Sequence, residues 1–153
     1  MSEFVCKCGK CAGTNPNAKL VDYLEKLHAA LNCRAIVVTS GYRCPTHSVS
    51  VGGFANDAHT KNIAADVICY SKSGGIIPVE TVAAAAERIG FSGIGLMSGG
   101  AIHLDIRDLT NYYNSHWFGD ERTGEDITTF QPKAVETIIE LGSKKYKITL
   151  TEV

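Results

Sequence analysis

The pattern of apolar and polar positions predicts two helices in the first 90 residues. In TNPNAKLVDYLEKLHAALNC, leucines recur at helical spacing, and Asn15 followed by Pro16 supplies the expected helix start. A second helix is predicted in PVETVAAAAERIG, with Pro78 near its start and Gly90 directly after its end. The apolar face of the first helix consists of Leu20, Leu24, Leu27 and Leu31.

Short runs of β-branched and apolar residues predict the strands. AIVVTS and IAADVICY are each bounded by turn residues. GIGLM and AIHLDIR are joined by SGG, which predicts a hairpin. GYRCPTHSVSVGGFAND is expected to be a long loop, and DLTNYYNSHWFGDERTGED a loop or lid. This order of elements predicts an α+β fold.

The chain is expected to form one domain, residues 1–153. Its 153 residues are enough for one sizeable core, and no repeat or linker interrupts them. Near the end, Tyr146, Ile148 and Leu150 alternate as in a strand, and residues 135–141 are either a hairpin partner or part of a helix. Residues 130–153 are therefore expected to extend the domain as a C-terminal β-hairpin.

Composition excludes several classes of protein. Hydrophobic residues make up 44%, charged residues 20%, and the formal net charge is -1, as in ordinary soluble globular proteins. The chain has no basic region typical of a nucleic-acid partner, and its apolar runs are too short to span a bilayer. The N-terminus lacks the pattern of a Sec signal peptide, so we expect synthesis in the cytoplasm.

Three of the six cysteines crowd into CKCGKC. Without a signal peptide, reduced thiols are the default. The spacing of Cys6, Cys8 and Cys11 would provide three ligands for a structural zinc, with Cys44 as the candidate fourth. Three interpretations stay open: a structural zinc site, a disulfide, or ordinary thiols.

A carboxylate inside an apolar strand needs a partner. Asp66 lies in IAADVI, and an isolated buried charge is too costly to leave unpaired. In AIHLDIR, alternation places His103, Asp105 and Arg107 on the face opposite the apolar residues, either as a site or as a solvent-facing edge. With His59 from the preceding loop, Asp66 and His103 form a ligand set known for catalytic zinc, with an open position for water.

The other histidines have weaker signals. His28 lies beside the leucines of the first helix and is expected to be structural. His47, in the long loop, either supports that loop or contacts substrate. His116, in the polar aromatic segment, is expected at the surface.

Three motifs, SGYRCPTHSVSVGG, DAHTKNIAADV and IHLDIR, resemble the M15 peptidases, a family of zinc D-Ala-D-Ala carboxypeptidases and phage-type endolysins. The resemblance runs from FVCKCG through HWFGDERTG. It implies a hedgehog/DD-peptidase-like fold, in which an antiparallel sheet carries the zinc site and helices pack on the other side. It also implies that His59, Asp66 and His103 hold zinc and that the substrate is the peptide stem of peptidoglycan.

The resemblance assigns roles and shows departures. Arg43 would bind a carboxylate or carbonyl oxygen of the substrate, with stapling of the loop as the alternative. Asp57 replaces the usual Ser and could change how His59 is oriented, and Asn62 replaces the usual Gly, whose left-handed backbone Asn tolerates. Gly100 stands where many members have the general base.

The glycine at position 100 leaves the general base unassigned. Asp105 shares a strand face with His103, so it is the candidate base, or it orients a ligand histidine, or it pairs with Arg107 or Arg43. Trp117 lies in a segment that would form one wall of the cleft or else cover the core.

Three hypotheses follow. The protein is a zinc peptidase of cell-wall peptides (a D-Ala-D-Ala carboxypeptidase or an endolysin-type endopeptidase), an inactive zinc-containing peptide-binding module, or a structural protein without metal. We expect a monomer that acts at the cell wall after phage-type release, with no nucleic-acid partner.

Overall fold

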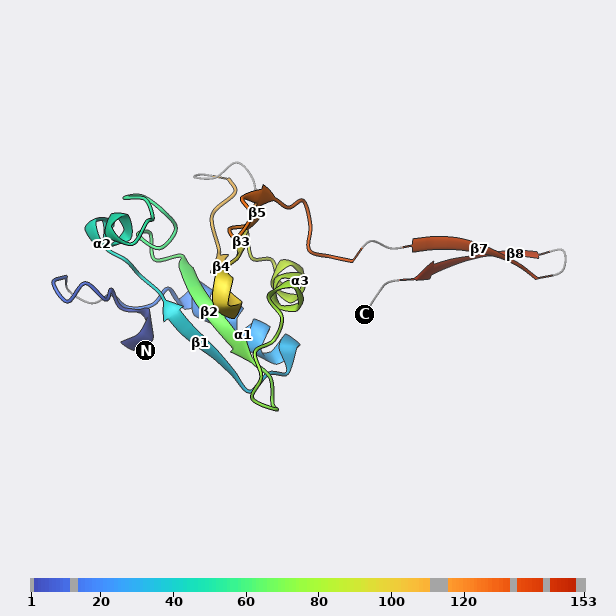
Figure 1. The fold of residues 1–153 in the computed structure, drawn as a ribbon, viewed down its shortest axis with the longest axis horizontal. Helices are drawn as coiled ribbons and strands as arrows, with labels where there is room; N and C mark the ends of the chain where they lie inside the picture. Colours follow the sequence, from blue (N-terminus) through green and yellow to red (C-terminus); the bar gives the residue numbers. More distant parts are fainter. Residues whose placement is uncertain (1, 12–13, 111–115, 133–134, 142–143, 151–153) are drawn as a thin grey trace.

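The protein is built around a six-stranded sheet with strand order β1-β2-β4-β3-β5-β6 (Figure 1). A computed structural model describes residues 2–11, 14–110, 116–132, 135–141 and 144–150. The predicted α+β class is confirmed. The strands of the sheet are β1 (Ala35–Ser40), β2 (Ala64–Tyr70), β3 (Gly93–Leu96), β4 (Ala101–Asp105), β5 (Trp117–Asp120) and β6 (Glu125–Asp126).

The sheet is mixed, whereas an antiparallel sheet was expected. Strands β3 and β4 form the predicted hairpin, but β5 pairs with β3 in parallel. Because β4 runs antiparallel to β3 and β5 runs parallel to β3, β5 and β4 have opposite directions. The segment expected to be a loop or lid therefore contributes β5 and β6, and buried Phe118 anchors β5 in the core.

Two long helices, α1 (Ala18–Leu31) and α3 (Val79–Ile89), pack against each other and against the sheet (Figure 1). Helix α1 begins after Asn17, not Asn15, because the Asn17 side-chain oxygen accepts hydrogen bonds from the backbone N–H groups of Lys19 and Leu20. The expected long loop contains a short helix, α2 (Pro45–Ser50), since a proline at the first position favours a helix start. Two 3-10 turns, η1 (Ser2–Phe4) and η2 (Ser98–Gly100), complete the helical elements of the described residues.

The core lies between the two long helices and one face of the sheet. The predicted leucine face of α1 is confirmed, with Leu20 and Leu27 fully buried. From the sheet, every second residue enters this core, as alternation in a strand requires. The sheet residues of the core include Ala65, Val67, Cys69, Ile94, Leu96, Ile102, Leu104 and Phe118.

The C-terminal segment forms a separate two-stranded sheet. Strands β7 (Val135–Leu141) and β8 (Lys144–Leu150) pair antiparallel, so this segment adopts the hairpin rather than the helix. Figure 1 shows it as a ribbon that stands away from the six-stranded sheet. Among the described residues, no helix has the length and apolar character needed to cross a membrane.

Candidate metal centre and substrate cleft

The polar face of the sheet carries the candidate site. In the register of β2 with β4, Asp66 lies directly opposite His103, and Ala64 lies opposite Asp105. The neighbours of these residues along each strand enter the core, so alternation directs Asp66, His103 and Asp105 to the side away from the helices.

The third candidate ligand, His59, comes from the loop before β2. Asn62 turns this loop with φ +59°, which confirms the left-handed conformation expected where the family usually has Gly. The Nδ1 atom of His59 lies 2.7 Å from the carbonyl oxygen of Gly41. Because a carbonyl can only accept, Nδ1 carries the ring proton, and Nε2 keeps its lone pair for a metal.

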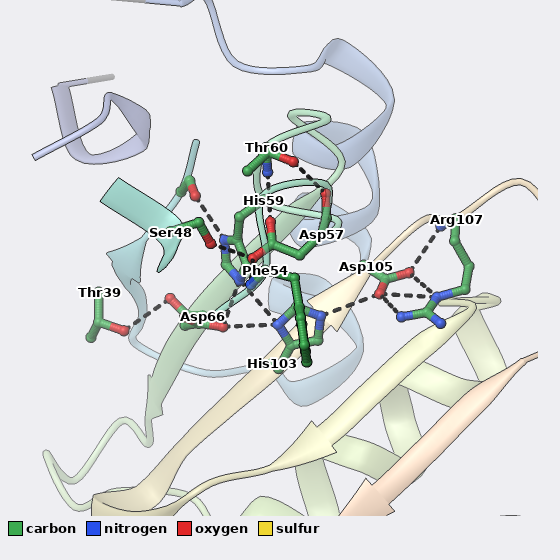
Figure 2. Close-up of polar contacts among 11 residues, drawn as sticks. Thr39, Ser48, Phe54, Asp57, His59, Thr60, Asp66, His103, Asp105 and Arg107 are labelled. Carbon is green, nitrogen blue, oxygen red and sulfur yellow. Dashed lines mark hydrogen bonds and ion pairs between the residues drawn. The ribbon is translucent and has the colours of Figure 1, made fainter. Parts of the chain in front are cut away.

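Three donor atoms meet in a small triangle (Figure 2). Asp66 Oδ1 lies 3.1 Å from His59 Nε2 and 3.0 Å from His103 Nδ1, and the two nitrogens lie 3.1 Å apart. Tetrahedral zinc with nitrogen and oxygen ligands separates its ligands by about 3.3 Å. The residues present therefore fit a zinc ion with three protein ligands and one open position.

Interactions with the two histidines favour the ionised form of Asp66. Burial alone raises the pKa of its carboxyl, but hydrogen bonds with His103 and His59 outweigh burial and hold the pKa well below its usual range. The carboxylate is thus ionised at neutral pH and can act as a ligand.

Asp105 contacts the other side of the His103 ring. Its Oδ2 lies 3.2 Å from Nε2 of His103, and its two oxygens also accept hydrogen bonds from Arg107, with Nε–Oδ1 2.9 Å. Burial raises the pKa of Asp105, but the bonds from Arg107 and His103 outweigh it and lower the pKa well below its usual range. The ionised carboxylate holds the proton of His103 on Nε2 and leaves Nδ1 free to bind a metal.

His103 itself shows the effect of two carboxylates. Burial alone lowers the pKa of its imidazole, but hydrogen bonds with Asp105 and Asp66 outweigh burial and raise the pKa to about 9. A metal would take the place of the proton on Nδ1, while the proton shared with Asp105 stays. Of the three interpretations of Asp105, the ion pair with Arg107 is present, and the contact with His103 Nε2 is compatible with the orienting role as well. The role of Asp105 as base stays a prediction.

Glycines in β3 make room for this site. A Cβ on Gly93 would stand only 2.0 Å from Asp105 Oδ2. A Cβ on Gly95 would stand 2.7 Å from Glu121 Oε1 and 2.8 Å from the Trp117 ring. The sequence GIGL thus has glycine at both positions that face the site, because side chains from β4 and the β5 region lie over them.

An open cleft of about 700 Å³ lies over the triangle. Val51 and Phe54, both exposed, contribute apolar surface from the loop after α2. Trp117 contributes from β5, with its ring edge-on to His103 at 5.9 Å between centroids. Arg43 also lines the cleft, and its Nε is buried with no hydrogen-bond partner among the described residues. Whether Arg43 binds substrate or staples the loop stays a prediction.

The family model described as Peptidase M15 matches residues 1–105, which is 105 of the 153 residues and includes all three candidate ligands. The chain belongs to the peptidase M15 family. A comparison with curated proteins found no match. Membership of this family implies a metallopeptidase with a peptide substrate.

His47 lies outside the lining of the cleft. His47 lines a smaller pocket of about 420 Å³, together with Cys8, Cys11 and Cys44. Its Nδ1 lies 3.5 Å from the Ser50 hydroxyl. The structure therefore separates His47 from the triangle, while it brings Arg43 and Trp117 to the cleft.

Asp57, which replaces the usual Ser of the family motif, supports the loop that carries His59. Its carboxylate accepts hydrogen bonds from the Ser48 hydroxyl, the Thr60 N–H at 2.9 Å and the Phe54 N–H at 3.3 Å (Figure 2). These bonds occupy the carboxylate oxygens within the loop. Asp57 thus contributes to the position of His59 through the backbone.

Glu121 is a cleft residue that sequence reasoning missed. It follows β5 on the same face as Trp117, and it lies over Gly95, whose partner in β4 is His103. The alternation of Trp117, Gly119 and Glu121 was the available signal, but that segment was expected to be a loop, where alternation carries no information about faces.

A second group of possible ligands lies in the N-terminal region. We use the name cysteine cluster for Cys6, Cys8, Cys11 and Cys44, whose sulfur atoms all lie within 4.8 Å of one another. The sulfurs of Cys8 and Cys11 are 3.2 Å apart. The fold therefore brings Cys44 to the three cysteines of CKCGKC.

Proposed function

We propose that the protein is a zinc-dependent peptidase that cleaves peptide bonds in the stem peptide of peptidoglycan, and so acts at the cell wall. The observation that supports this most strongly is the triangle of His59 Nε2, Asp66 Oδ1 and His103 Nδ1, with edges of 3.0 to 3.1 Å beneath an open cleft. These three residues would hold the zinc. When bound, zinc lowers the pKa of a water molecule to about 7 and polarises the carbonyl to be cleaved.

Two residues would position the ligands. The Gly41 carbonyl fixes the proton of His59 on Nδ1, and Asp105 fixes that of His103 on Nε2. Each ring therefore presents its unprotonated nitrogen to the metal. Arg107 holds Asp105 in place from the other side.

Arg43 would bind the substrate. Its guanidinium is permanently charged and matches a carboxylate with two parallel hydrogen bonds. The C-terminal carboxylate of a D-Ala-D-Ala stem supplies such a partner in a carboxypeptidase, and a carbonyl oxygen takes its place in an endopeptidase. The apolar side chains of Val51, Phe54 and Trp117 would contact the methyl groups of alanine residues in the stem.

Glu121 is the best-placed general base. Cross-strand neighbours in a sheet have Cβ atoms about 5 Å apart. Because the Glu121 carboxylate lies over Gly95, and Gly95 pairs with His103, the carboxylate stands one strand away from the triangle and on the same face. In this role Glu121 takes a proton from the attacking water and returns it to the leaving amine.

The second candidate is an inactive zinc-containing module that binds cell-wall peptides. The observation behind it is Gly100, at the position where many family members carry the base. Gly100 has φ +78°, and a Cβ there would stand 2.8 Å from Ile76. The site therefore has no base at the usual position, and catalysis depends on a carboxylate from elsewhere.

Hydrolysis of purified peptidoglycan separates the two candidates. We expect the zinc-loaded protein to release new amino groups: free D-Ala if it is a carboxypeptidase, or new N-termini within the stem if it is an endopeptidase. A Glu125→Gln variant, which changes an exposed acid on β6 outside the cleft lining, should match the wild type. Tight binding of stem peptide without any release would support the inactive module.

A further inference from the structure

We propose that the cysteine cluster binds a structural zinc ion, which fastens the N-terminal segment to the loop that carries Arg43. This site is distinct from the His/Asp/His triangle and shares no residue with it. Its role would be structural, because four thiolates complete a tetrahedral shell and leave no position for substrate.

The sulfur positions fit four-coordinate zinc. With Zn–S bonds of about 2.3 Å, tetrahedral geometry separates the sulfurs by about 3.8 Å. The sulfurs of the cluster lie within 4.8 Å of one another, and those of Cys8 and Cys11 are 3.2 Å apart. One disulfide would use two of the four sulfurs, whereas all four lie close enough to one another to bind a single ion.

Backbone N–H groups point at the sulfurs, as is favourable for thiolates bound to a metal. Cys8 Sγ accepts from the N–H groups of Lys10 at 3.3 Å and Cys11 at 3.4 Å. Gly9, with φ +67°, allows the tight turn that directs both groups to one sulfur. Cys6 Sγ accepts from the N–H of Cys44 at 3.3 Å. These donors stabilise negative charge on sulfur and orient the ligands.

The cluster joins two segments that meet beside the catalytic site. The Phe4 carbonyl accepts a hydrogen bond from the Tyr42 N–H at 2.8 Å. A Cβ on Gly41 would stand 2.5 Å from Phe4 Cα, so only glycine permits this approach. Gly41 also supplies the carbonyl that orients His59, and Arg43 directly precedes Cys44. Closing the cluster on a metal would therefore hold both Gly41 and Arg43 in position.

Metal content and cobalt spectra test the site without an activity assay. We expect the full chain, purified with zinc, to contain two equivalents. Cys44→Ser and His103→Ala should each contain one equivalent, and the double variant none. The control Cys33→Ala removes a buried thiol outside the cluster and should keep two. Cobalt-substituted protein should show sulfur-to-cobalt charge-transfer absorption, which Cys44→Ser loses and His103→Ala retains.

The outcomes separate the two sites even if Cys44→Ser fails to fold, because the wild-type measurements stand alone. One equivalent in the wild type with the cobalt–sulfur absorption supports the cysteine site and removes the triangle. One equivalent without that absorption overturns the cysteine site and leaves the proposed function intact. A count of six free thiols after denaturation in chelator without reductant is expected, and four or fewer would show a disulfide and overturn the proposal.

Discussion

The two faces of the central sheet meet different demands, and β4 shows both in five residues. Ile102 and Leu104 point into the core between sheet and helices, where shape and volume determine the contribution to stability. His103 and Asp105 point the other way, into a network of charges and oriented ring nitrogens. Asp105 is fully buried, so burial alone does not distinguish the faces. The geometry of donor atoms therefore determines the residues of the cleft face, and packing determines those of the helix face.

Glycine is distributed accordingly. On β3, Gly93 and Gly95 alternate with buried Ile94 and Leu96. The helix face of β3 carries large apolar residues and its cleft face carries none, because side chains of Asp105, Trp117 and Glu121 occupy that space. Substitutions on the cleft face should therefore change zinc binding and turnover more than folding, and substitutions on the helix face should do the reverse.

The largest effect is expected for His103→Ala. Loss of one ligand should remove the zinc of the triangle. Because bound zinc supplies several kcal/mol of transition-state stabilisation, its loss should lower the rate of peptide hydrolysis by about 10³-fold or more. Metal analysis and release of amino groups from peptidoglycan measure both losses. A variant that keeps its full zinc content and its activity would show that the ligand set is wrong.

Glu121→Gln should reduce turnover by about 10²- to 10⁴-fold, the usual contribution of a general base. Zinc content and thermal stability should stay at wild-type values, since the amide has nearly the same shape as the carboxylate. Kinetics on a stem peptide measure the effect, with Glu125→Gln as the matched control. Unchanged turnover would exclude Glu121 as the base.

Arg43→Lys should weaken peptide binding or turnover by about 10- to 100-fold, because a charged hydrogen bond contributes about 1.5–3 kcal/mol and lysine lacks the planar fork. Zinc content should not change. The control Arg34→Lys makes the same exchange outside the cleft lining and should leave kinetics unaltered. Strong destabilisation of Arg43→Lys would instead support stapling of the loop.

Asp105→Asn should lower zinc affinity by about 10- to 100-fold, as expected for a residue that orients a ligand histidine. Turnover should recover at saturating zinc. Asp120→Asn is the matched control, because Asp120 pairs with Arg122 two residues along the chain, as Asp105 pairs with Arg107, but lines no part of the cleft. Unchanged zinc affinity with a large loss of turnover would assign Asp105 as the base.

The smallest effect on activity is expected on the helix face. Ile102→Val removes one buried methylene and should lower the free energy of unfolding by about 0.5–1.5 kcal/mol. Zinc content and turnover of the folded protein should equal those of the wild type. Chemical denaturation and kinetics check this, and a loss of zinc affinity would show that the two faces are not independent.

Much of the fold could be predicted because its signals are local. The β-branched run Ala35–Ser40 and the glycine that ends α3 act on their own segments. Asp66 was informative since a carboxylate in an apolar run requires a partner. The position of the first helix cap was wrong because Asn15 and Asn17 both resemble caps, and only the side-chain hydrogen bonds distinguish them.

The remainder depends on contacts between distant segments. The parallel pairing of β5 with β3 joins residues more than 20 positions apart, and no feature of WFGD indicates which strand it pairs with. For the same reason, the position of Glu121 over Gly95 could not be read from either segment. The separation of His47 from the cleft likewise involves a distant segment, because His47 lines a pocket together with Cys8 and Cys11.

We infer that zinc held by His59, Asp66 and His103 makes this M15 family member a peptidase. The most direct measurement is release of amino groups from purified peptidoglycan by the wild-type protein before chelation, after chelation and after zinc is restored. We predict release that chelation abolishes and zinc restores, with no release by His103→Ala at any stage. Release that persists in the fully chelated protein, or zinc-loaded protein that releases nothing, would contradict the claim.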